Sequence, residues 1–213
     1  MQEVLEKAIC FLEEKLNNST SIDAVEKKYR LEHSLRVANI ACSIAKKEGQ
    51  DVFITTLAAI LHDVGKFDTE ENIEHGRVSA DVALVFLKTL NISKKQLDDI
   101  HFCIASHVDG CAGYEYENIP EADTVSDADN IDRFGVYRIY QQLTWDNVEA
   151  LPALECAEKY SIIAEKTERF REANTLSTST ANEMFRKNLD IQIGFYKNLA
   201  EELKQTECAV LCP

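Results

Sequence analysis

Apolar residues in this chain recur every three or four positions, which is the spacing of one face of an α-helix. The strict alternation typical of half-buried strands never continues long enough to build a sheet. The clearest stripe predicts a helix over residues 2–17, and a second predicts a helix that His33 opens and Gly49 ends. The apolar positions of these two stripes are Val4, Leu5, Ala8, Ile9, Leu12 and Leu16, then Leu35, Val37, Ala38, Ala41, Ile44 and Ala45.

Six further helices follow from the same periodicity, and they make the expected fold all-α, a bundle of seven or eight helices. Asp51 and Ser93 are expected to cap two of them, because a short polar side chain can accept hydrogen bonds from the first free N–H groups. Two of the seven glycines lie in residues 108–120, which predicts a loop over the site entrance. The six helices are expected near residues 51–63, 77–90, 93–107, 122–143, 152–173 and 179–205.

The aromatic residues after the Asp-rich segment at 127–129 are spaced as on one face of a helix. Tyr137, Tyr140 and Trp145 are therefore expected to pack in the core or to line a cleft, and not to stack on nucleobases.

Composition narrows the classes of function. The chain has 213 residues, of which 45% are hydrophobic, enough for one sizeable core. The formal net charge is −14, and a surface of that sign repels nucleic acid polymers at long range. A small phosphorylated substrate is still compatible, because a cation and a few local basic residues dominate at short range.

The termini and the cysteines indicate the compartment. Glu3 and Glu6 stand where a signal peptide needs basic residues, and no stretch approaches the roughly 20 apolar residues of a membrane span. We therefore expect a cytoplasmic protein that does not bind a membrane. The seven cysteines are odd in number and lack Cys-x-x-Cys spacing, which predicts reduced thiols and neither a disulfide framework nor a structural zinc site. They are Cys10, Cys42, Cys103, Cys111, Cys156, Cys208 and Cys212.

The candidate chemistry lies in polar residues inside apolar helical sequence. His62 and Asp63 are adjacent at the end of one apolar helix, and His33 lies in another. Buried charge is costly unless it is paired or bound to metal. A divalent cation held by His33, His62, Asp63 and one Asp of the later cluster at 127–129 satisfies these side chains together.

Two basic residues are expected beside this cation. Arg30 precedes His33 by about one helical turn, and Lys66 follows His62 by four residues. A guanidinium fork and an ammonium both suit phosphate oxygens. The mixed nitrogen and oxygen donors suit Mn, Fe, Ni, Co, Zn or Mg. Such an ion lowers the pKa of bound water toward neutrality, so the expected reaction is attack of metal-bound hydroxide on phosphorus.

Three motifs together resemble those of a known family. They are Arg30-x-x-His33-Ser34-x-x-Val37, His62-Asp63-x-Gly65-Lys66 and Asp127-Ala128-Asp129. Over about residues 28–140 they look like the H…HD…D pattern of the HD-domain superfamily of metal-dependent phosphohydrolases. Residues 178–203, with Thr178, Arg186 and Phe195, are similar to the ending of small stand-alone bacterial HD hydrolases.

The resemblance implies an all-helical single domain over residues 1–213. Its core covers about residues 28–140, and the helices near 152–205 pack on it. It implies that Arg30 contacts substrate phosphate and that Lys66 neutralises it. Asp127 would then support a ligand or cap a helix. The implied metal ligands are His33, His62, Asp63 and Asp129.

The remaining histidines and one arginine leave alternatives open. His75 and His107 either hold a second metal, as in dinuclear members of the superfamily, or line the cleft and bind or protonate the substrate. Arg133 lies four residues after Asp129, so it either orients that carboxylate, reaches the substrate or forms a surface ion pair. His101 faces another side of its helix and is expected to be structural.

The leading function is hydrolysis of a small phosphorylated substrate, a nucleotide first among them. Asp63, Arg30 and Lys66 are the expected catalytic residues, with Asp63 both binding metal and orienting the attacking water. One alternative is a non-catalytic metal-binding sensory or scaffold module. Another is a dinuclear-iron oxygenase of the same fold, which requires both His75 and His107 as ligands. The sequence leaves the oligomeric state open.

Overall fold

The computed structural model describes residues 1–206, so Cys208 and Cys212 lie outside the described residues. The described part of the chain contains nine α-helices, two short 3₁₀ helices and no strand, as expected for an all-α fold. None of its helices is long and apolar enough to cross a membrane. The chain forms two compact units, Met1–Asp132 and Arg133–Pro213. The expected packing of the C-terminal helices on the core as one domain stays a prediction.

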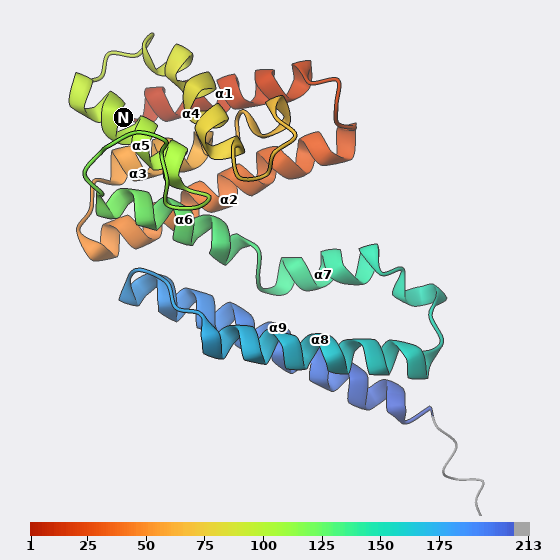
Figure 1. Ribbon diagram of the computed structural model, residues 1–213. Coiled ribbons are helices and arrows are strands. Elements are labelled where there is room, and N and C mark those ends of the chain that lie inside the picture. Colours follow the sequence, from red (N-terminus) through yellow and green to blue (C-terminus); the bar gives the residue numbers. More distant parts are fainter. Residues whose placement is uncertain (207–213) are drawn as a thin grey trace, which may run out of the picture. The chain divides into compact units, whose positions relative to one another are not determined.

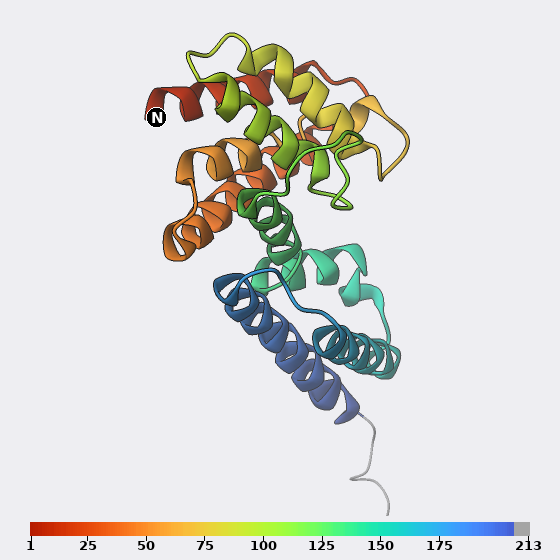
Figure 2. The ribbon, with the colours of Figure 1, turned by 60° about the vertical axis from the view of Figure 1, so that its left-hand side comes forward.

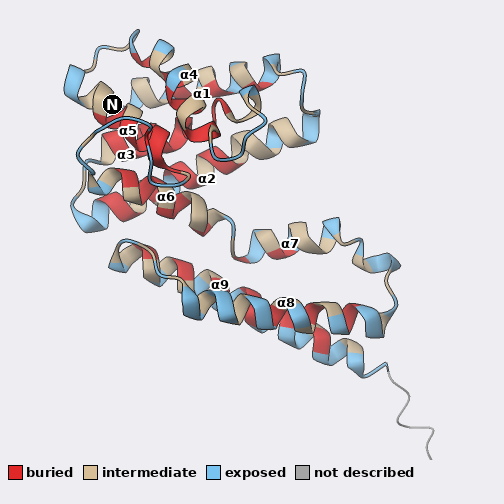
Figure 3. Cartoon of the chain, in the orientation of Figure 1, coloured by how far each residue is buried: buried red, intermediate tan, exposed pale blue. Residues whose placement is uncertain are grey.

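The first unit is a bundle of six α-helices (Figures 1 and 2). The central helix is α3, in which every residue from Ile54 to Leu61 is buried (Figure 3). A helix that is apolar on all sides belongs inside a bundle, and α1, α2, α5 and α6 all contact it. The elements of this unit are α1 Gln2–Asn18, α2 Ala24–Glu48, α3 Val52–Leu61, η1 Lys66–Asp68, α4 His75–Leu87, α5 Lys94–Ser106 and α6 Pro120–Asp132.

Local hydrogen bonds set the ends of these helices. The Asp51 carboxylate accepts from the backbone N–H groups of Phe53 and Ile54, and Ser93 forms a capping box with Gln96, so both expected caps are confirmed. Gly49 ends α2 in the left-handed region, at φ +72°.

The start of the helix that carries His33 was predicted wrongly. His33 does not open this helix but lies well inside α2, which begins nine residues earlier, at Ala24. The Asp23 side chain caps it by accepting from the backbone N–H of Glu26. The sequence signal for this helix start was the acidic pair Asp23 and Glu26, whose spacing of three residues resembles a capping box.

The second unit contains the remaining helices. Here α8 and α9 run side by side, joined by a short connection (Figures 1 and 2). Tyr160 and Tyr196 stack across them, with ring centroids 5.3 Å apart. Asp146 accepts hydrogen bonds from Gln142 and from the Tyr160 hydroxyl. The elements are α7 Val136–Trp145, η2 Val148–Ala150, α8 Ala153–Ala173 and α9 Ser179–Lys204.

The predicted count of seven or eight helices is too low. The single helix expected over residues 122–143 is divided into α6 and α7. Gly135 causes the break, since its φ of +103° lies outside the range that a right-handed helix needs. The aromatic residues of α7 are also not in the core: Tyr137, Tyr140 and Trp145 are 43%, 64% and 59% exposed.

Candidate metal centre

The buried helix α3 delivers two site residues at its C-terminal end. His62 caps the helix, and Asp63 lies in the turn that follows. This turn packs directly on α4: a Cβ on Gly65 would lie 2.9 Å from backbone atoms of Val78 and Ser79. The Gly65 N–H also donates to Ser79 Oγ at 3.0 Å. A glycine at this position therefore lets Asp63 approach the helix that carries His75.

Two other helices bring in the remaining predicted ligands. His33 Nε2, from α2, lies 3.2 Å from Asp129 Oδ1, from α6. His62 Nε2 lies 3.8 Å from the same Asp129 oxygen. The potential ligand atoms of His33, His62 and Asp129 all lie within 4.8 Å of one another. The structure thus gathers residues that are about a hundred positions apart in the chain.

Three histidines share one hydrogen-bonding pattern that defines their tautomer. Each ring donates its Nδ1–H to the backbone carbonyl three residues earlier. A carbonyl only accepts, so Nδ1 carries the proton and the Nε2 lone pair is available as a ligand. The pairs are His62 with Ala59 at 2.8 Å, His107 with Ile104 at 2.8 Å, and His75 with Asn72.

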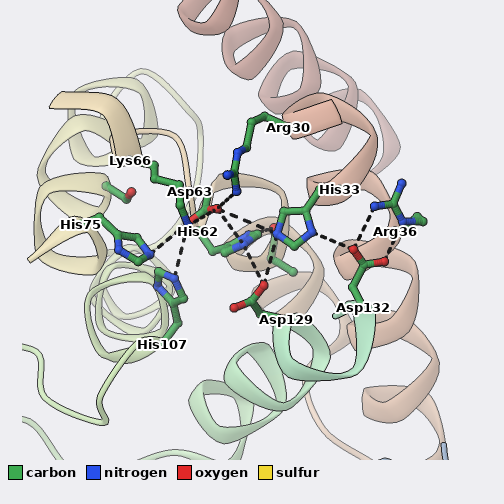
Figure 4. Close-up of polar contacts among 12 residues, drawn as sticks. Arg30, His33, Arg36, His62, Asp63, Lys66, His75, His107, Asp129 and Asp132 are labelled. Carbon is green, nitrogen blue, oxygen red and sulfur yellow. Dashed lines mark hydrogen bonds and ion pairs between the residues drawn. The ribbon is translucent and has the colours of Figure 1, made fainter. Parts of the chain in front are cut away.

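The fourth histidine is oriented by a carboxylate. His33 Nδ1 donates to Asp132 Oδ2 at 2.7 Å. Arg36 holds Asp132 in turn, through Nε to Oδ1 at 2.6 Å and Nη2 to Oδ2 at 2.9 Å. This arrangement leaves His33 Nε2 facing the centre, and it is the kind of supporting contact that metal-binding histidines use (Figure 4).

Asp63 lies between the two groups of histidines, as Figure 4 shows. Its Oδ1 faces His75 Nε2 at 3.2 Å and His107 Nε2 at 3.7 Å. Its Oδ2 faces His62 Nε2 at 3.7 Å and His33 Nε2 at 3.9 Å. The carboxylate can therefore reach ligands on both sides, and His62, Asp63 and His107 form a second group with ligand atoms within 4.8 Å of one another.

The burial of these atoms fits a bound cation. His62 Nε2, His107 Nε2 and Asp63 Oδ1 are buried and have no hydrogen-bond partner. Buried polar atoms are normally paired, and each unpaired one costs free energy. A divalent ion held by histidine nitrogens and carboxylate oxygens supplies the missing partner.

The titration behaviour follows from the same packing. Burial by itself lowers the pKa of His33, but hydrogen bonds to Asp129 and Asp132 outweigh it and raise this pKa to about 9. Burial dominates at His62, whose pKa falls to about 4. Burial alone would raise the pKa of Asp63, but the surrounding histidines and Lys66 hold it well below its usual range. Asp63 is thus an anion, and His62 a neutral donor, at ordinary pH.

Both predicted basic residues reach this carboxylate. Lys66 Nζ lies 2.9 Å from Asp63 Oδ2, and Arg30 Nη1 lies 3.5 Å from the same oxygen. The Arg30 guanidinium lies beside the rings of Tyr29 and Phe67, at 5.2 and 5.5 Å from their centroids. Lys66 belongs to the short helix η1 and not to a continuation of α3. Each side chain keeps about a fifth to a quarter of its surface exposed, so both remain accessible to a ligand.

Sequence reasoning missed one residue of the centre. Asp132 supports His33, and the available signal was its position one turn after Asp129 on α6. Asp127, the residue expected to support a ligand or cap a helix, lies inside α6 and does not cap it, and its role in supporting a ligand stays a prediction. Arg133 is exposed in the turn after α6, and its role in substrate binding stays a prediction.

Comparison with known proteins gives the family. A family model for the HD domain matches residues 30–133, the stretch that holds all the residues of the centre. The chain contains an HD domain over these residues. The histidine and aspartate residues that the motif names are His33, His62, Asp63 and Asp129, which the structure brings together.

Individual relatives of this HD-domain protein are distant. Ribonuclease Y 1 of Pediococcus pentosaceus is 31% identical over 81 residues, which are 38% of this chain and 14% of that protein. The chain therefore matches only a small part of that relative.

Three solved structures share the fold. An HD-superfamily hydrolase of Bacillus thuringiensis has a TM-score of 0.67 at 19% identity, covering 95% of this chain and 98% of that one. YpgQ of Bacillus subtilis, in complex with ADP, has a TM-score of 0.66 at 20% identity, with coverages of 94% and 95%. A predicted HD superfamily hydrolase from an uncultured Thermotogales bacterium has a TM-score of 0.65 at 18% identity, with coverages of 92% and 91%.

Proposed function

We propose that this HD-domain protein is a metal-dependent phosphohydrolase that acts on a small phosphorylated substrate. One observation carries the proposal. Four histidine Nε2 atoms surround the buried Asp63 carboxylate, and the same carboxylate faces the basic residues Arg30 and Lys66. A cation site and a phosphate site therefore adjoin at one side chain.

The first cation would be held by the predicted set of His33, His62, Asp63 and Asp129. A second cation would use His75 and His107, with Asp63 shared between the two positions. A bound divalent ion lowers the pKa of a coordinated water toward neutrality and polarises a phosphoryl oxygen.

The protein's own side chains position the substrate. Arg30 offers a planar fork for two phosphate oxygens, and its place beside Tyr29 and Phe67 limits the rotamers it must give up on binding. Lys66 adds a compact positive charge. Asp63, held as an anion, accepts a hydrogen bond from the attacking water and so orients it toward phosphorus.

Charge and the relatives support a nucleotide as the substrate. A formal net charge of −14 disfavours long nucleic acid polymers, so a nucleotide is a better candidate than RNA. The ADP complex of the distant Bacillus subtilis YpgQ supports the choice of a nucleotide. The short match to ribonuclease Y 1 supports a phosphoester as the bond that is cleaved.

Two other functions use the same residues. A non-catalytic sensory or scaffold module would not need Arg30 and Lys66 beside the centre, which favours an enzyme. A dinuclear-iron oxygenase would use His75 and His107, which do face Asp63, but it gives no role to the adjoining basic pair. Dioxygen consumption by the Fe(II)-loaded protein, without phosphate release, would support the oxygenase instead.

The test is phosphate release from a panel of nucleotides and sugar phosphates with Mn²⁺, Co²⁺, Ni²⁺, Zn²⁺ and Mg²⁺. We expect release from at least one nucleotide, and its loss together with metal binding in Asp63→Ala, while circular dichroism stays helical. The control is Asp190→Ala, which removes a carboxylate paired with Arg171 in the second unit and should change neither property. Metal binding without release from any substrate would overturn the proposal and favour the scaffold.

A further inference from the structure

His75 and His107 reach the centre from helix ends, where the backbone is held least firmly. His75 is the first residue of α4, and His107 is the residue that caps the C-terminus of α5. Terminal turns lack part of their backbone hydrogen bonds and fray. The two rings are nevertheless 5.1 Å apart and both face Asp63 Oδ1. Some contact must therefore keep the two helix ends in register.

Arg77 makes that contact through all three of its guanidinium nitrogens. On the α4 side, Nε and Nη2 donate to the two Glu74 carboxylate oxygens at 2.9 and 2.8 Å, and Nη2 also donates to the Ile73 carbonyl at 3.3 Å. On the other side, Nη1 donates to Asp109 Oδ1 at 3.2 Å and to the Cys111 carbonyl at 2.6 Å. One side chain thus joins the residues just before His75 to the loop just after His107.

Two glycines make room for this arrangement. A Cβ on Gly76 would lie 2.8 Å from the Ala105 carbonyl oxygen and 3.3 Å from His107 Nδ1, so α4 approaches the end of α5 at the closest distance a backbone allows. Gly113 has φ +82°, and a Cβ there would lie 3.1 Å from Arg77 Cδ. The loop therefore folds against the Arg77 side chain, which is only 20% exposed.

We propose that Arg77 is a positioning residue for the His75–His107 half of the centre. It acts by holding the start of α4 and the loop after α5 together, so that both imidazoles keep their Nε2 atoms directed at Asp63. It does not touch a ligand atom itself. The inference rests on the proposed function, because it assumes that this half binds a cation.

The loop has other anchors, and they provide a matched control. The Tyr114 hydroxyl lies 2.7 Å from His101 Nδ1, and the Tyr116 hydroxyl donates to Asp99 Oδ1 at 2.6 Å. Both hydrogen bonds tie the loop to residues of α5 and not to α4. Tyr116→Phe removes one such anchor, so it loosens the loop without separating the two histidine-bearing ends.

The experiment measures Mn²⁺ bound per full-length chain by equilibrium dialysis with elemental analysis. We expect two ions in the wild type, and in Arg77→Ala a second ion that binds about 10- to 100-fold more weakly, the usual effect of removing a supporting contact. The first ion should keep its affinity within about twofold of the wild-type value, and a larger change counts as a loss. Tyr116→Phe should bind both ions as the wild type does. Arg77→Lys should stay weakened, because an ammonium cannot bridge both sides.

A double-mutant comparison separates positioning from general stability. In His75→Ala, which lacks one ligand of the second position, adding Arg77→Ala should leave the affinity of the remaining ion unchanged. A further loss there, or an equal loss in Tyr116→Phe, would show that Arg77 only supports the fold and would overturn the inference. Unchanged binding of two ions in Arg77→Ala would overturn it as well.

The same data keep the two proposals apart. A wild-type chain that binds a single ion rejects the role of Arg77, because the His75–His107 half then holds no cation, and leaves the proposed function standing. A wild-type chain that binds no ion rejects both. Thermal melting of each variant shows whether Arg77→Ala is folded; if it is not, Arg77→Lys replaces it in the comparison.

Discussion

Replacing Asp132 by Asn tests the support of the metal centre without touching a predicted ligand. The carboxylate takes three hydrogen bonds with its two oxygens, one from His33 at 2.7 Å and two from Arg36 at 2.6 and 2.9 Å. An amide of the same shape has one acceptor oxygen, and its NH₂ group faces the donors that remain. Either His33 or Arg36 must then lose its partner.

The size of the effect follows from what His33 loses. Burial lowers the pKa of His33, but its hydrogen bonds to Asp129 and Asp132 raise it to about 9, so Asp132 helps to make the ring a stronger donor to a cation. Removing such a partner usually lowers metal affinity by about 10- to 100-fold. At about 1.4 kcal/mol for each factor of ten, this is about 1.4 to 2.8 kcal/mol of binding free energy.

The assay is a competition titration of Mn²⁺ against a chelating dye, with Asp123→Asn as the control. Asp123 lies on the same helix and accepts a hydrogen bond from Asn118 Nδ2 at 3.4 Å, away from the centre. We expect the loss in Asp132→Asn alone. If the Mn²⁺ affinity of Asp132→Asn is within about twofold of the wild-type affinity, a difference that unrelated substitutions also produce, the reasoning is refuted.

Three further predictions concern packing, substrate and pH. Gly76→Ala should lower the free energy of unfolding by about 1 to 3 kcal/mol, because the added Cβ meets the Ala105 carbonyl. The control Gly194→Ala, whose Cβ enters open space, should not lower this free energy, and chemical denaturation measures both variants. Arg30→Lys should raise KM several-fold in steady-state phosphate release and leave Mn²⁺ affinity unchanged, and the reverse pattern would contradict a phosphate role. Burial raises the pKa of Tyr196 to about 12, from about 10 in an unfolded chain, so its contribution to stability is complete below pH 10 and is lost as the pH rises to about 12. Tyr196→Phe should therefore show a shallower loss of stability over that range, and an equal slope would contradict this.

Local features of the fold could be predicted from the sequence because their causes are local. Asp51 and Ser93 cap helices through N–H groups two or three residues away, so the pattern that predicts the cap is contiguous. The break at Gly135 was missed because the apolar spacing continues through it from α6 into α7. Periodicity reports which face is apolar, and it does not report a single residue with positive φ.

Part of the candidate site could likewise be predicted from the sequence, and part could not. The grouping of its candidate ligands could be predicted because buried polar residues in apolar helices need partners, and the motif supplied the pairing of His33 with Asp129. Asp132 was missed because its importance depends on Arg36, which is 96 positions away in the sequence. The choice between a second ligand set and a cleft wall for His75 and His107 stays a prediction, and the orientations of their rings, which contacts to backbone carbonyls help to set, could not be predicted from the sequence.

The most direct test of the metal centre is anomalous scattering from crystals of the full-length protein grown with Mn²⁺. We predict an anomalous peak within coordination distance, about 2.0 to 2.3 Å, of His33 Nε2, His62 Nε2 and a carboxylate oxygen of Asp63 and of Asp129. A peak that lies elsewhere on the protein, with these four side chains at their present distances and no density between them, would contradict the account.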